Sequence, residues 1–176
     1  MPVMPERFTD LLAYPPISRV RRNHGLEHAT LFVLAERHPG RSLAGHSDFR
    51  GFWIVGDVET AELTSAVNDA LQRLNTGQSH LAVHPFCGTN LATAGVLAGG
   101  AAALAMFGAG RRWRDKLDRL PLAISLATLA LLFAQPLGMT LQREVTTSGV
   151  PGALRVVSIT PQVRGQIKAH RVLTEG

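Results

Sequence analysis

The chain has 176 residues, a length that suits a single domain, and its formal net charge at neutral pH is +5. No tract of Lys and Arg is interleaved with aromatic residues, so nucleic acid is not expected as a partner. The single cysteine, Cys87, excludes a disulfide bond within the chain.

The N-terminal segment, residues 1–18, contains several prolines and is predicted to be an irregular arm with one short helical turn at 8–12. It has no apolar run of signal-peptide length, so no cleaved signal is expected. A helix is predicted to follow. Asn23 is a favourable N-cap for it, and the Pro-Gly pair at 39–40 stops it after Arg37.

This helix carries His24, Glu27 and His28 in the order H-x-x-E-H. Residues three and four apart share one helix face, so the three side chains point the same way. Two neutral imidazoles one turn apart can hold a metal ion, and a carboxylate between them can accept a proton from metal-bound water. The pattern is an inverted zinc-protease motif. In the alternative reading, the histidines pair with Glu27 or bond to nearby backbone, and the motif is structural.

The string HGLEHATLFVL also resembles the active-site helix of the pitrilysin and insulysin peptidases. The resemblance is local to this one helix. It implies that His24 and His28 bind Zn²⁺ and that Glu27 acts as the general base.

A β-hairpin is predicted next, with strands at 42–46 and 51–55, because the second strand is rich in aromatic and β-branched residues. Apolar residues then recur at helical spacing over 58–74 and predict an amphipathic helix. Asp57 or Thr60 is expected to cap this helix.

The stretch SHLAVHPFCGTN, residues 79–90, is a second group of candidate metal ligands. A short strand is predicted at 81–84. His84 or Cys87 could meet the H-x-x-E-H face and supply a third ligand, with Glu144 as a further candidate. In the alternative reading, this stretch is a tight turn that caps the following helix.

Two uncharged runs, 91–110 and 120–142, have the length needed to span a bilayer, and a basic turn at 111–119 joins them. We expect a membrane hairpin rather than a buried soluble one, because a small domain has little room to bury two such runs. The residues around Pro136 are expected to break the second helix. The predicted location is the bacterial inner membrane. The side of the membrane on which the soluble part lies is left open. The positive charge of the turn at 111–119 favours a cytoplasmic turn, which would place the soluble part outside. The missing signal favours a cytoplasmic soluble part.

Strands are predicted at 154–160 and 167–173, paired across a turn at 161–165. The predicted fold class is therefore α+β. A small domain built from 19–90 and 143–174 is interrupted by a transmembrane helical hairpin at 91–142.

The segments NHGLEHAT, FWIVGDV, HPFCGTN and QREVTT, together with the two apolar runs, resemble an uncharacterised bacterial membrane family known as a domain of unknown function. The resemblance spans residues 19–173. It implies a membrane protein with two spans and brings no activity with it.

The function predicted from these patterns is a membrane-anchored metal-binding protein, more specifically a zinc-dependent hydrolase of the peptidase type. Glu27 is the catalytic candidate, and the metal candidates are His24, His28, His84 and Cys87. The expected partners are the lipid bilayer and either a membrane protein complex or a peptide substrate. The alternative is a non-catalytic membrane accessory or assembly protein whose His and Glu side chains are structural.

Overall fold

The structure, a computed structural model, describes residues 6–165 and 167–176. It divides into two compact units. The first, which we call the α+β unit, comprises Met1–His84 and Arg143–Gly176, and the second, which we call the helical unit, comprises Pro85–Gln142. Helices and an antiparallel sheet are both present, so the α+β fold class predicted from the sequence is confirmed.

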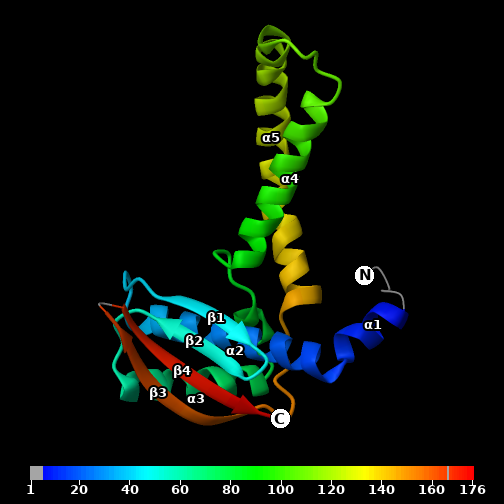
Figure 1. The fold of residues 1–176 in the computed structure, drawn as a ribbon. Helices are drawn as coiled ribbons and strands as arrows, with labels where there is room; N and C mark the ends of the chain where they lie inside the picture. The colour runs from blue at the N-terminus through cyan, green and yellow to red at the C-terminus, as the bar shows by residue number, and fades with distance from the viewer. Residues whose placement is uncertain (1–5, 166) are drawn as a thin grey trace. The chain divides into compact units, whose positions relative to one another are not determined.

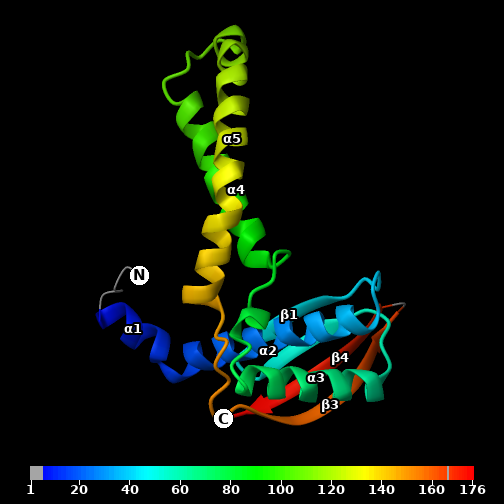
Figure 2. The ribbon, with the colours of Figure 1, turned by 180° about the vertical axis from the view of Figure 1, so that it is seen from behind.

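The α+β unit is built on a four-stranded antiparallel sheet with the strand order β1-β2-β4-β3. The strands are β1 (Ala44–Asp48), β2 (Gly51–Val55), β3 (Arg155–Arg164) and β4 (Ile167–Glu175). Helices α2 (Pro15–Arg37) and α3 (Thr60–Asn75) cover one face of this sheet (Figure 1, and Figure 2 from behind). The core lies between the two layers, and its fully buried members include Leu26, Val33, Leu34, Phe52, Ile54, Leu63, Val67 and Val172.

The described part of the N-terminal segment is helical except for a bend at Tyr14, so the prediction of an irregular arm is wrong from residue 6 onward. The short helical turn predicted at 8–12 is confirmed, because it lies within a helix, and residues 1–5 lie outside the described part. Helix α1 (Glu6–Ala13) is followed by α2, which begins at Pro15. A proline is well suited to the first turn of a helix, where its missing N–H has no intrahelical partner to lose. Asn23 is therefore inside α2 and does not cap it. Its buried side chain donates to the carbonyl oxygen of Asp48 (2.8 Å) and accepts from the hydroxyl of Thr174 (2.7 Å).

The predicted hairpin is confirmed, although β1 starts two residues later than expected and leaves a two-residue connection to β2. The predicted strand at 81–84 is wrong, because this stretch belongs to a 3₁₀ turn, η1 (Ser79–Ala82).

The helix predicted at 58–74 is confirmed as α3, but neither expected cap is formed. Residue 59 is the N-cap and makes no side-chain capping bond. Asp57 instead pairs with Lys168 (2.8 Å), and the hydroxyl of Thr60 lies 2.9 Å from Nε2 of His170.

The paired C-terminal strands are also confirmed, but β3 includes residues 161–164, which were predicted to belong to the turn. Pro161 lies within β3, opposite His170. β3 is an edge strand, so it pairs with a neighbouring strand on one side only. A proline, which has no backbone N–H to donate, is tolerated on such a strand.

The helical unit is a hairpin of α4 (Gly88–Met106) and α5 (Trp113–Leu141). Pro136 does not break α5, which continues to Leu141 and passes into a π-helical turn, η2 (Gln142–Thr146). Both helices are long and apolar enough to cross a membrane. Only 11% of the apolar window of each is buried within the protein. Large apolar side chains more than three-fifths exposed include Leu91, Val96, Leu104, Trp113, Ile124, Leu132 and Phe133.

Candidate metal centre

The two motif histidines lie one turn apart on α2. The ring centroids of His24 and His28 are 4.4 Å apart, with the rings edge to face. His28 is 2% exposed, and His24 is half-buried. The two histidines therefore share a helix face, as the spacing predicted, and their imidazoles come together. Glu27, predicted on the same face, lies instead against Gly45 and Ser47 of the β1–β2 hairpin.

Each of these rings uses Nδ1 to bond to a backbone carbonyl. His24 Nδ1 lies 3.0 Å from the carbonyl oxygen of Thr146, and His28 Nδ1 lies 2.8 Å from that of Ala82. A carbonyl oxygen can only accept, so Nδ1 must carry the proton, and in the neutral ring the lone pair is then on Nε2. A metal-binding histidine characteristically makes such a bond, which fixes its tautomer and ring orientation.

His84 completes a row of imidazoles in the α+β unit. Its ring centroid is 5.8 Å from that of His28 and 5.1 Å from that of Phe32. Burial lowers the pKa of His84, and the neighbouring His28 lowers it further. Both effects favour the neutral ring, which is the form that binds metals.

Glu27 is 3% exposed and turns toward the β1–β2 hairpin. Its carboxylate accepts a hydrogen bond from the hydroxyl of Ser47 and packs against Gly45, where a Cβ would overlap it. Burial raises the pKa of Glu27, against the opposing effects of the Ser47 hydrogen bond and of positive charge on His24 and His46. The structure thus gives Glu27 a defined packing role and places its carboxyl group within electrostatic reach of His24.

Cys87 belongs to the helical unit, where it is 7% exposed and caps α4. Its Sγ accepts a hydrogen bond from the backbone N–H of Thr89 at 3.4 Å. Only two residues separate it from His84, so covalent geometry alone keeps the two Cα atoms within about 11 Å. The other ligand candidate, Glu144, acts electrostatically on Arg21, and its carbonyl oxygen accepts from that guanidinium at 3.0 Å.

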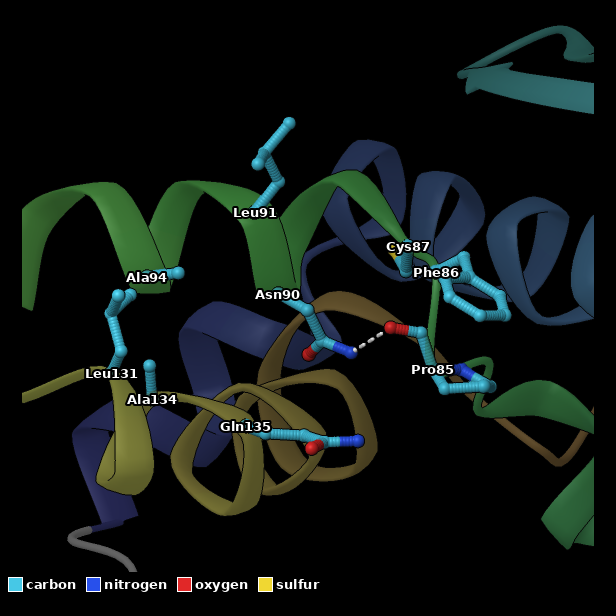
Figure 3. A pocket seen from close by; sticks show the side chains of 9 residues that line it. All are labelled: Pro85, Phe86, Cys87, Asn90, Leu91, Ala94, Leu131, Ala134 and Gln135. Atoms are coloured by element: carbon cyan, nitrogen blue, oxygen red, sulfur yellow. Dashed lines mark hydrogen bonds between the residues drawn. The ribbon is translucent and has the colours of Figure 1, made fainter. Parts of the chain in front are cut away.

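Cys87 also lines a pocket of about 390 Å³ within the helical unit (Figure 3). Asn90, on the first turn of α4, donates to the carbonyl oxygen of Pro85 (2.7 Å) and accepts from Nε2 of Gln142 (2.8 Å). Gln135 on α5 also lines the pocket. Asn90 belongs to the stretch 79–90, which the sequence assigned either to candidate metal ligands or to a turn that caps the following helix. Gln135 was not predicted from the sequence as a functional residue, although it is a polar residue within the uncharged run 120–142.

The partners that hold the motif were also missed from the sequence. Thr146 lies 122 positions from His24, and Ala82 lies 54 positions from His28. Backbone carbonyls have no sequence signature. The one available signal was Gly25, a glycine inside a helix, which indicates a close approach by another segment.

Residues 19–159 match the family described as "Domain of unknown function (DUF6391)". The chain belongs to this family. An uncharacterized protein of Picosynechococcus sp. (strain ATCC 27264 / PCC 7002 / PR-6) is 38% identical over 143 residues. That match covers 73% of this chain and 66% of the relative, so the chain spans just under two thirds of the relative's length. No solved structure matches. The resemblance to a domain of unknown function is thereby confirmed, and membership of DUF6391 brings no activity with it.

Proposed function

We propose that this DUF6391 protein is a membrane-anchored metal-binding protein in which His24 and His28 are two of the ligands. The observation that carries this proposal is the pair of Nδ1 bonds to backbone carbonyls, which orient both imidazoles as metal ligands are oriented.

We propose Cys87 as the third ligand and His84 as the alternative. Two imidazoles and a thiolate are a donor set that could hold a metal ion. Imidazole nitrogen and thiolate sulfur are typical ligands of Zn²⁺, and Cu and Ni bind imidazole as well. We propose Zn²⁺ as the ion. The short covalent link between His84 and Cys87 makes both available to one centre.

The finer proposal is that the centre is a zinc-dependent hydrolase of the peptidase type with Glu27 as its base. A bound Zn²⁺ would supply an acidified water and polarise a carbonyl. The raised pKa of Glu27 supports this role, because a base is most effective when its pKa lies near the working pH. Its electrostatic interaction with His24 supports it as well.

The second candidate is a non-catalytic accessory protein, and a specific contact favours it. The Glu27 carboxylate is bonded to Ser47 and fitted over Gly45, so it fastens α2 to β1. A carboxylate committed to packing in this way needs no metal.

The membrane part of the proposal is supported by the exposed apolar surface of α4 and α5. A soluble monomer seldom exposes a continuous apolar patch of this extent, whereas a bilayer covers it without cost. We place the protein in the bacterial inner membrane, with a membrane protein complex or a peptide as its partner.

The test is elemental analysis of the full chain, purified in detergent without chelator from zinc-supplemented cells. Wild-type protein should hold about one metal ion per chain. His24→Ala, His28→Ala and Cys87→Ser should each lose it, while His38→Ala, which removes a surface histidine paired with Glu62, should retain it.

Glu27→Gln separates the two roles of the carboxylate. Under the hydrolase proposal the variant keeps its metal and loses any peptide hydrolysis. Wild-type protein with well under one metal per chain would overturn metal binding altogether and leave the accessory role.

A further inference from the structure

A cleft of about 550 Å³ opens on the α+β unit where α2 begins. Its walls come from three separate segments: Pro16, Ile17 and Val20 of α2, Phe49 between β1 and β2, and Val145 of η2. All five side chains are apolar, so the cleft is suited to hydrocarbon.

One of the apolar side chains that line the cleft is itself largely exposed. Phe49 is 59% exposed. Tyr14, two positions before Pro16 in the chain, is 58% exposed. An exposed aromatic side chain in the wall of an apolar cleft indicates a surface that something apolar covers.

The same place is positively charged. Arg21 lines the cleft, and its guanidinium donates to the backbone carbonyl oxygen of Glu144, which is a neutral acceptor. Within residues 6–165 and 167–176, no carboxylate lies within 4.0 Å of this guanidinium, although Glu144 acts on Arg21 from further away. Positive charge is therefore left over for an anion.

Chain connectivity brings the cleft to the membrane. Val145 follows the last residue of α5, Leu141, by four positions, so covalent geometry keeps their Cα atoms within about 14 Å. If α5 crosses a bilayer, the cleft lies near its surface. This step rests on the membrane anchoring proposed above.

We propose that the cleft binds an anionic phospholipid of the adjoining leaflet. One acyl chain lies along Ile17, Val20 and Val145, and the phosphate meets Arg21. A bilayer lipid combines the hydrocarbon that the apolar walls require with an anion for the Arg21 guanidinium. It also places that lipid beside His24, which shares the cleft wall, so the lipid is a candidate substrate or modulator of the metal centre.

The test uses the full chain in detergent and phosphatidylglycerol that carries a photoreactive diazirine in one acyl chain. Mass spectrometry should find labelled peptides that contain residues 16–24 and 145–146. Val20→Trp, which fills the cleft, should lower this labelling roughly tenfold, equivalent to about 1.4 kcal/mol of binding. Val163→Trp, at a site on β3 that is 73% exposed, should leave it unchanged. Ile17→Trp replaces Val20→Trp if the latter melts early.

A second comparison tests the charge. Arg21→Gln should reduce labelling by phosphatidylglycerol to the level given by photoreactive phosphatidylcholine. Arg155→Gln, which removes an exposed arginine paired with Glu175, should not.

Labelling of wild-type protein that is confined to α4 and α5 would overturn lipid binding in the cleft. Equal labelling of Val20→Trp and the control Val163→Trp would overturn it as well. Equal labelling of wild-type protein by the two lipids would overturn the anionic preference. Metal content and resistance to alkaline washing are measured on the same samples. If wild-type protein keeps its metal and resists alkaline washing but shows no labelling of the cleft, only the lipid proposal is refuted. If alkaline washing releases the protein from the membrane, the membrane anchoring is refuted.

Discussion

Replacing Gly25 with alanine tests whether the metal motif depends on a close approach between two distant segments. Gly25 follows His24 directly, and the segment after η2 crosses α2 at this point, where the N–H of Ser148 donates to the carbonyl oxygen of Arg21 (2.9 Å). A Cβ at position 25 would overlap the carbonyl oxygen of Ser148 and lie 3.0 Å from its carbonyl carbon. These are backbone atoms, so the crossing segment would have to move as a whole.

The magnitude follows from the contacts that this movement disturbs. Overpacking costs about 1–3 kcal/mol. Each hydrogen bond lost from the crossing segment, Ser148 to Arg21 and His24 to Thr146, costs about 0.5–1.5 kcal/mol. Alanine in place of glycine returns about 1 kcal/mol of helix propensity. We expect Gly25→Ala to lower stability by about 3 kcal/mol, or roughly 6–12 °C in Tm.

The assay is thermal melting of the detergent-purified chain, followed by circular dichroism, with metal content measured in parallel. Gly99→Ala on α4 is the matched control, because nothing lies within 4 Å of a Cβ at that helical glycine. It should melt at or slightly above the wild-type temperature and keep its metal. If Gly25→Ala melts as high as Gly99→Ala, the close approach does not hold the motif and the reasoning is refuted.

Three further outcomes are expected. Burial lowers the pKa of His170 from its usual 6.5, so the unfolded chain takes up the proton at higher pH than the folded chain does. Stability should therefore fall as pH drops below about 6.5, and His170→Gln should lose part of that dependence in melts between about pH 7.5 and 5.5. Asp48→Asn removes the negative charge that faces the 9%-exposed Arg171 at 2.7 Å and should cost about 1–2 kcal/mol by thermal melting. Asp57→Asn, which removes the charge from an exposed pair with Lys168, should cost less than about 0.5 kcal/mol. The protein should stay in the membrane pellet after high-salt and alkaline washing, and recovery in the soluble fraction would contradict the two-span proposal.

Regular periodicity made much of the fold predictable. The apolar stripe of α3 and the strand-forming residues of β2 and β4 specify their elements locally, and the structure agrees. Prolines caused two errors. α2 begins at Pro15, although the sequence predicted that it begins at Asn23. Pro136 lies inside α5 and does not end it. The effect of a proline depends on its position in the helix and on what surrounds it.

The candidate site was predictable only in its local part. The H-x-x-E-H spacing places His24 and His28 on one face, and this needs only helix geometry. The orientation of each ring is set by a carbonyl brought in by tertiary folding, and the position of Glu27 is set by Ser47 across the hairpin. Contacts of this kind depend on which segments the fold brings together, so no spacing rule could have supplied them.

The order of the strands has a consequence for synthesis of the protein. β4 lies between β2 and β3 in the sheet, yet both β3 and β4 follow the helical hairpin in the chain. While the ribosome is producing α4 and α5, β2 has only β1 beside it, and its other edge is unpaired. Such an edge is open to pairing with other chains. The α+β unit can therefore close its sheet only after both apolar helices have left the ribosome. Under the proposed membrane anchoring, insertion of these helices can begin before the unit that carries His24 and His28 is complete.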